Sequence, residues 1–330
     1  MSVPTSIVIG FTPFHLLPMR EVLKEIEGNV YLFHPIADNP SVDKTRNGLA
    51  FLGACDSTRR IRIMKYFSAG RAIHRLMLRN SKVDIYIPHP FNPLSNYAFF
   101  HPRSSARYIY QDGILNYHDA PSPLAAFRWR TRQMLRSAAA ALPYKFYAGH
   151  LSGIDSRPIA GGFFTHPTLI VGAAKFPLLR RISFEAGTRR EISGPRGGTL
   201  FLDQPIERIL DRNLAADVRR RTIHYVNSLG GQVLYKPHYA QGRSMSNDPT
   251  WTRLPGELDA LPAEWVVRKL GVSNAVSFTS SALANIAMSD SAVTCHATAA
   301  DMTRIFVNGR ATTLSELFLS LGVQVTHLPR

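Results

Sequence analysis

Short apolar runs alternate with helical patterns along the first half of the chain. The runs at 6–10, 30–34 and 83–88 are rich in β-branched or aromatic residues and end at or just before turn or breaker residues, as strands do. Between the first two runs, residues 16–27 follow a helical pattern, and residues 107–110 form a further strand-like run. A strand–helix–strand unit that repeats predicts a parallel sheet with helices on both faces.

The same α/β pattern restarts in the second half. It predicts strands at 199–203, 232–235, 275–278 and 291–295, and helices at 207–229, 280–288 and 313–321. Between the halves, residues 187–198 combine glycine, proline and charge, which is typical of a linker. A chain of 330 residues also exceeds the usual size of one hydrophobic core. We therefore expect two α/β domains, residues 1–190 and 191–330, and weak order in the polar stretch 240–248.

The charge and the cysteines narrow the functional classes. The chain has 39 Lys and Arg against 23 Asp and Glu, a formal net charge of +16, so a polyanionic ligand or surface is expected: nucleic acid, anionic lipid headgroups or an acidic glycan. The two cysteines, Cys55 and Cys295, lack the spacing of a disulfide framework or a zinc site, which fits a reducing cytoplasm. The apolar run at 7–11 is too short for a signal peptide or a membrane span.

A basic helical pattern covers residues 123–141. Its aromatic and apolar residues alternate with arginines: Phe127, Trp129 and Met134 stand among Arg128, Arg130, Arg132 and Arg136. The pattern favours a solvated basic face above a stripe of core residues. Contact with an anionic membrane surface is the alternative interpretation.

Polar residues follow three of the predicted strands. Asp112 comes directly after the strand at 107–110 and before Gly113, which has no side chain to hinder a sharp turn or a close ligand. A carboxylate at the carboxyl end of a strand in an open α/β sheet lies where ligands bind, and it can accept the proton of a hydroxyl group. An ordinary Asp-Gly turn is the structural alternative.

The second domain carries two further candidate groups. His238 and Lys236 follow the strand at 232–235, and an imidazolium there could neutralise or protonate a leaving phosphate. Ser280 and Ser281 come directly before a helix, whose free N–H groups and dipole attract anions. A packing histidine, a solvated lysine and a plain helix cap are the structural alternatives.

In this order, Gln111-Asp112-Gly113, Lys236-Pro237-His238-Tyr239 and Thr279-Ser280-Ser281 resemble three motifs of bacterial sialyltransferases. The likeness is to the lipooligosaccharide sialyltransferase and α-2,8-polysialyltransferase families, which carry an acidic-acidic-Gly, a His-Pro and a Ser or Ser-Ser motif. It extends to three further segments: Thr12-Pro13-Phe14-His15-Leu16-Leu17, Pro88-His89-Pro90 with Asn92, Leu94 and Asn96, and Phe201-Leu202-Asp203-Gln204-Pro205.

The resemblance implies a GT-B-type fold, with two Rossmann-like domains facing across a cleft, the first on the acceptor side and the second binding a CMP-sugar. It implies Asp112 as the general base, His238 as the residue that assists the departure of CMP, and Lys236, Ser280 and Ser281 as binding CMP or its phosphate. Thr12, Pro13, His15, His89 and Gly113 are expected at the acceptor side or in the cleft. Two positions depart from the family: Gln111 replaces an acidic residue, and Tyr239 replaces the proline that follows the histidine in the family motif.

The implied reaction is inverting transfer of sialic acid from CMP-sialic acid to a hydroxyl of a lipooligosaccharide, a capsule or polysialic acid. No metal and no cofactor are expected, since Asp-x-Asp, Walker, HExxH and GxGxxG segments are lacking. The expected partners are the CMP-sugar, a glycan acceptor that a lipid carries in some cases, and an anionic membrane surface; a homodimer is left open. The expected location is the cytoplasm, including the periphery of the bacterial inner membrane on its inner face.

Three alternative functions remain at this point. The first is transfer from CMP-Kdo or the CMP derivative of another ulosonic acid, which shares the carboxylate-bearing anomeric carbon. The second, a basic nucleic-acid-binding protein, would show a basic strip interleaved with stacking aromatics, whereas the arginines here are scattered, so no nucleic acid is expected. The third is an inactive scaffold in envelope-glycan assembly, an option that Gln111 keeps open.

Overall fold

The chain folds into two compact units, Met1–Phe184 and Glu185–Arg330. The computed structural model describes residues 4–34, 49–51, 59–123, 127–184, 197–238, 248, 250–259, 261–289 and 292–328. The expected boundary at 190/191, most of the expected linker and most of the polar stretch 240–248 lie outside these residues, as do Cys55 and Tyr239.

The first unit is built on a seven-stranded sheet with the order β3-β2-β1-β4-β5-β6-β7, in which every pairing is parallel. Its central strands are rich in buried β-branched and aromatic residues, which suit a sheet covered on both faces. The strands are β1 (Thr5–Ile9), β2 (Asn29–Phe33), β3 (Leu49–Phe51), β4 (Val83–Ile87), β5 (Ser104–Tyr110), β6 (Gly161–Phe164) and β7 (Leu179–Arg181).

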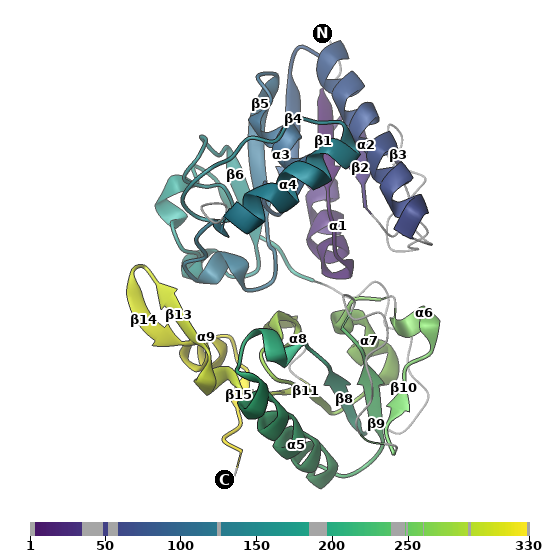
Figure 1. The fold of residues 1–330 in the computed structure, drawn as a ribbon, viewed down its shortest axis with the longest axis vertical. Helices are drawn as coiled ribbons and strands as arrows, with labels where there is room; N and C mark the ends of the chain where they lie inside the picture. The colour runs from purple at the N-terminus through teal and green to yellow at the C-terminus, as the bar shows by residue number, and fades with distance from the viewer. Residues whose placement is uncertain are drawn as a thin grey trace. The chain divides into compact units, whose positions relative to one another are not determined.

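Four α-helices accompany this sheet in the described part of the unit. They are α1 (Leu16–Glu25), α2 (Arg59–Arg79), α3 (Pro93–Phe100) and α4 (Phe127–Ala140). Helices α2, α3 and α4 pack against one another, while α3 also contacts β4 and β5 (Figure 1). Every residue of α3 is buried, so α3 is the inner helix of the three.

Helix α4 does not have the core stripe that its sequence pattern favours. Phe127 is 84 % exposed and Met134 60 % exposed, whereas Gln133, Ser137 and Ala140 are buried. The packing explains the difference, because α4 meets α2 through small groups: a Cβ at Gly70 would lie 2.3 Å from the carbonyl oxygen of Ala140. So close an approach turns the short side chains of Ser137 and Ala140 inward, together with Gln133, and leaves the large apolar ones in solvent.

The second unit repeats the topology with a six-stranded parallel sheet of order β10-β9-β8-β11-β12-β15. An antiparallel hairpin, β13 (Arg304–Val307) and β14 (Arg310–Thr313), stands apart from it. The sheet strands are β8 (Thr199–Leu202), β9 (Val233–Lys236), β10 (Thr252–Arg253), β11 (Asn274–Ser277), β12 (Thr294–Ala297) and β15 (Gln324–Val325). The helices are α5 (Arg212–Ser228), α6 (Gly256–Asp259), α7 (Ala263–Leu270), α8 (Ser281–Ser289) and α9 (Leu314–Ser320).

In both sheets the third, second, first, fourth and fifth strands of the unit are neighbours in that order, which is the doubly wound Rossmann order. The fold class is GT-B-type, with two Rossmann-like domains in one chain, as the resemblance implied. The predicted element positions are also confirmed within a few residues for most elements. The strand expected at 291–295 lies later, at Thr294–Ala297, and the helix expected from 207 begins at Arg212. In the described part of the chain, no helix combines the length and the hydropathy needed to cross a membrane.

Candidate active site

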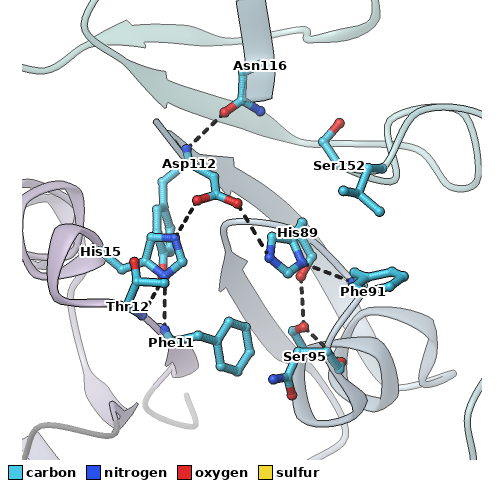
Figure 2. Close-up of polar contacts among 12 residues, drawn as sticks. Phe11, Thr12, His15, His89, Phe91, Ser95, Asp112, Asn116 and Ser152 are labelled. Carbon is cyan, nitrogen blue, oxygen red and sulfur yellow. Dashed lines mark hydrogen bonds and ion pairs between the residues drawn. The ribbon is translucent and has the colours of Figure 1, made fainter. Parts of the chain in front are cut away.

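Three side chains of the first unit converge at the carboxyl edge of its sheet. Strands β1, β4 and β5 are neighbours, and each is followed by one of them: His15 after β1, His89 after β4 and Asp112 after β5. The strand order reverses between β1 and β4, so this edge is the topological switch point, where open α/β sheets bind ligands. Figure 2 shows the Asp112 carboxylate between the two imidazole rings.

His15 is fully buried and has a fixed tautomer. It ends the short helix η1 (Pro13–His15), and its Nδ1 accepts the main-chain N–H groups of Phe11 at 2.9 Å and Thr12 at 3.3 Å. Because Nδ1 is an acceptor, the proton of the neutral ring lies on Nε2, which donates to Asp112 Oδ1 at 2.8 Å. Thr12 and Pro13 belong to the turn that holds this ring, and the Thr12 carbonyl accepts the His15 N–H at 3.0 Å.

His89 approaches the carboxylate from the other side in the same way. Its Nδ1 accepts the Phe91 main-chain N–H at 3.1 Å, so Nε2 carries the ring proton and lies 3.4 Å from Asp112 Oδ2. Burial lowers the pKa of His89 to about 4 against the opposing charge of Asp112, and the neighbouring His15 and Arg136 lower it further. His89 is therefore neutral at pH 7.

The carboxylate is the proton acceptor of this cluster. Burial raises the pKa of Asp112, but the electrostatic interaction and hydrogen bond with His15, followed by the electrostatic interaction with His89, outweigh burial and hold that pKa below its ordinary value. The Asp112 side chain is 23 % exposed, and each of its oxygens keeps a lone pair beyond the one that faces an imidazole. Both imidazoles use Nδ1 for a main-chain N–H, so neither offers a vacant acceptor. Asp112 is thus the group that can take a proton from a ligand.

The backbone around Asp112 is fixed as well. Gly113 has φ +55°, in the left-handed region that favours glycine, which confirms the sharp turn expected there. The Asn116 side chain accepts the Asp112 main-chain N–H at 2.9 Å and is itself buried. The sequence reasoning missed Asn116, although an amide four residues after a strand-end aspartate is a signal for such a local bond.

Gln111 faces away from the catalytic candidate. Its side chain is fully buried, and Oε1 accepts the N–H and the hydroxyl of Thr165, both at 2.8 Å, and the Tyr117 hydroxyl at 2.9 Å. Gln204 repeats this arrangement in the second unit, where its Oε1 accepts the Thr279 N–H at 2.8 Å. Gln111 therefore ties the ends of two neighbouring strands, and the role expected for Asp112 does not need a second acidic residue there.

The switch point of the second unit lies between β8 and β11, and the expected serines follow β11 there. Ser280 precedes α8, where its Oγ accepts the Ala282 N–H at 3.3 Å and its carbonyl accepts the Leu283 N–H at 3.0 Å. Within the described residues, the Ser281 hydroxyl makes no hydrogen bond. Ser280 caps the helix, and Ser281 offers a hydroxyl to an anion at the positive end of α8.

The positions of Lys236 and His238 differ from each other. Lys236 ends β9, and its Nζ donates to the Asp259 carbonyl and lies 3.5 Å from Asp259 Oδ1. Burial lowers the pKa of Lys236, and Asp259 acts in the opposite direction. The Lys236 ammonium is thus already bound to Asp259 of the same unit. His238 lies half-buried two residues after β9, at the expected strand end.

A buried ionic network supports the same sheet edge, and the sequence reasoning did not identify it. Asp203 follows β8, where Oδ1 accepts from Arg219 at 2.9 Å and Oδ2 accepts the Tyr235 hydroxyl at 2.7 Å. Arg219 also lies over the Phe278 ring, 5.1 Å from its centroid. These bonds join β8, β9, β11 and α5 behind the switch point.

Glu264 is a second buried carboxyl of this unit and leads to a prediction on stability. Burial raises its pKa from 4.5 to about 7, although Asn285 donates to it at 2.9 Å and Lys236 and Arg268 lower the pKa. The folded state favours the protonated carboxyl. The contribution of Glu264 to the free energy of unfolding is therefore fully present below pH 4.5 and is lost as the pH rises through about 7. The total loss is about 3 kcal/mol.

Glu264→Gln keeps an acceptor for Asn285 but cannot ionise. The variant should therefore keep its stability as the pH rises, and above pH 7 it should unfold at a higher urea concentration than the parent. Urea unfolding of both proteins, followed by Trp fluorescence across this pH range, measures the difference. Parallel pH dependences in the two proteins would contradict the raised pKa.

Comparisons with known proteins give distant structural likenesses. Neither protein-family models nor curated protein sequences match this chain. The UDP-GlcNAc 2-epimerase of Methanocaldococcus jannaschii in complex with UDP-GlcNAc and UDP has 8 % identity and a TM-score of 0.49, over 98 % of this chain and 88 % of that one. The α/β-galactoside α-2,3-sialyltransferase of Photobacterium phosphoreum has 10 % identity and a TM-score of 0.49, over 98 % of both chains. Sucrose-phosphate synthase of Thermosynechococcus elongatus has 13 % identity and a TM-score of 0.42, over 90 % of this chain and 82 % of that one.

Proposed function

We propose that this protein is a metal-independent inverting glycosyltransferase that moves sialic acid from CMP-sialic acid to a hydroxyl group of a surface glycan. The observation that carries the proposal is the Asp112 carboxylate, ionised and partly exposed between two imidazole N–H groups at a switch point. The sequence resemblance described above supplies the donor and the class of acceptor.

In this reaction Asp112 takes the proton of the acceptor hydroxyl, and the hydroxyl oxygen forms a bond to C2 of the sialyl group. The bond from C2 to the phosphate oxygen of CMP breaks, and CMP leaves with the bonding electrons. His15 and His89 are positioning residues, since each donates towards one carboxylate oxygen and leaves the remaining lone pairs to the substrate. A carboxylate fixed in this way loses little freedom when the acceptor binds.

The nucleotide belongs to the second unit in this proposal. Ser281, with the start of α8, suits the phosphate of CMP, and the half-buried His238 is assigned to the departing phosphate. Ser280 contributes through the cap that orders the first turn of the helix.

CMP is expected to stabilise the protein without a divalent metal ion, more strongly than CDP, UDP or GDP. Thermal shift with each nucleotide measures this stabilisation, which grows with the ratio of the nucleotide concentration to its dissociation constant. Ser280→Ala combined with Ser281→Ala should weaken CMP binding by about 1–3 kcal/mol, the scale of hydrogen bonds to a charged group.

Because Ser280 is also a helix cap, the variant needs a control for the loss of a cap alone. Asp211→Ala provides one, since Asp211 caps α5 through the Leu214 N–H at 3.0 Å, and it should keep the stabilisation by CMP. Equal stabilisation by UDP or GDP would point to another class of glycosyltransferase. Transfer from CMP-Kdo in place of CMP-sialic acid would keep the mechanism and change the sugar.

A further inference from the structure

Helix α4 of the first unit presents an apolar stripe to solvent. Phe127, Thr131, Met134 and Ala138 recur at i, i+4, i+7 and i+11, the spacing that places side chains on one line along a helix. All four are exposed, and Leu135 beside them is 69 % exposed. A surface helix of a globular protein normally turns such a stripe towards the core, so this stripe calls for a covering partner.

Arginines border the stripe on both sides. At 100° per residue, Arg130 lies on one flank, and Arg128 and Arg132 lie on the other. The Arg130 guanidinium is 5.5 Å from the centroid of the Phe146 ring, which is itself 39 % exposed. The Arg132 guanidinium is 5.4 Å from the Trp129 ring. The charges are thus held beside the apolar residues, as in helices that lie in a membrane interface.

The neighbouring helix extends the positive surface. Helices α2 and α4 pack against each other (Figure 1), and α2 exposes Arg71, Arg75 and Arg79. The sequence has no acidic residue between Asp56 and Asp84, the stretch that contains α2, or from 120 to 154, the stretch that contains α4. A partner of this face therefore meets cations without a competing carboxylate on either helix.

We infer that α4 is an interfacial helix that binds the surface of a bilayer containing anionic phospholipids. The apolar stripe enters the region between headgroups and acyl chains, and the flanking arginines bind the lipid phosphates. A second copy of this chain fits poorly, because a symmetric contact would bring arginines against arginines. Nucleic acid fits poorly as well, because Phe127 is the single aromatic side chain of the stripe, and Met134 and Leu135 offer no stacking face. This inference does not depend on the proposed reaction.

The membrane site also adjoins the candidate active site. Trp129 of α4 lies edge-on to Phe91, with ring centroids 6.0 Å apart, and the Phe91 N–H is the group that holds His89 Nδ1. An acceptor carried by a lipid would therefore meet the protein near the face that binds the membrane.

Sedimentation with vesicles tests the inference. The full-length protein should bind vesicles of phosphatidylcholine mixed with phosphatidylglycerol far more strongly than vesicles of phosphatidylcholine alone. Arg128→Gln, Arg130→Gln and Arg132→Gln together should lower the partition coefficient about 100-fold. Phe127→Ser, Met134→Ser and Leu135→Ser together should lower it about 10-fold and leave the weaker binding more sensitive to salt.

The hairpin of the second unit offers a matched control with the same residue types on an exposed element. Arg304→Gln, Phe306→Ser and Arg310→Gln replace exposed residues and should leave vesicle binding unchanged. Circular dichroism and the unfolding midpoint of each variant establish that the fold is kept. Equal binding to neutral and anionic vesicles, or an equal loss in the hairpin variant, would overturn the inference. So would a dimer in sedimentation velocity that the Phe127, Met134 and Leu135 substitutions abolish without any effect on vesicle binding.

Discussion

Asp112→Asn is expected to lower the rate of transfer from CMP-sialic acid by roughly 10²–10⁴-fold, the usual scale for loss of a general base. Asparagine keeps the size of the side chain but cannot take a proton. CMP affinity should stay the same, because the proposal assigns the nucleotide to the second unit. Rates of transfer to a glycan acceptor and thermal shift with CMP, measured on the same preparations, separate the two effects.

The asparagine amide will also meet two imidazole N–H groups with only one acceptor oxygen, so some loss of stability in the first unit is expected. Asp84→Asn is the matched control: Asp84 accepts the Ser105 hydroxyl at 2.5 Å and belongs to β4, outside the cluster. This variant should transfer normally. Normal transfer by Asp112→Asn would reduce Asp112 to a turn residue, and loss of CMP binding in that variant would contradict the division of roles between the units.

Local patterns were sufficient to predict the parts of the fold that hold the candidate residues. The β-branched and aromatic runs that become β1, β4, β5, β8 and β11 are short and bounded by turn or breaker residues, so each strand end could be placed within a few residues. Asp112 indeed follows β5 directly, and Gly113 has the left-handed backbone expected of it. Ser280 precedes a helix as predicted.

Other elements carried no periodic signal. Helix α3 is buried at all eight positions and therefore lacks the alternation of polar and apolar faces by which a helix is recognised. Strand β6 begins with two glycines, Gly161 and Gly162, which are poor strand formers, and Gly162 is needed there because a Cβ would lie 2.3 Å from the Phe164 ring. The orientation of α4 depends on its close contact at Gly70, a tertiary feature that its own sequence does not encode.

The cluster itself depends on strand order. His15 and Asp112 are 97 positions apart in the chain, and they meet because β1, β4 and β5 are neighbours in the sheet. Sequence pattern predicts that these strands exist and are parallel, but their order is fixed by the packing of the whole domain. The resemblance placed His15 and His89 near the acceptor side and did not indicate that both donate towards the same carboxylate.

The two histidines lead to the last prediction, which concerns the pKa of Asp112. His15→Asn and His89→Asn each leave an amide oxygen near the position of Nδ1, so the main-chain N–H groups of Phe11 and Phe91 keep an acceptor. Each variant loses the Nε2 donor that faces Asp112. With both donors removed, burial raises the pKa of Asp112 without opposition.

The double variant should therefore lose activity at a higher pH than the parent as the solution is acidified. Its acid limb in the pH profile of kcat/KM moves upward, since the carboxylate that acts as base becomes protonated earlier. At neutral pH the rate should fall about 10–100-fold, because the charged Asp112 carboxylate loses one orienting hydrogen bond on each side.

His15→Gln is the complementary control. Its longer amide can still donate to Asp112, so this variant should keep the acid limb of the pH profile close to that of the parent. The ¹³C chemical shift of the Asp112 carboxyl reports the same pKa without any assay of transfer. An unchanged pKa of Asp112 in the double variant would show that the imidazoles do not hold this carboxylate ionised.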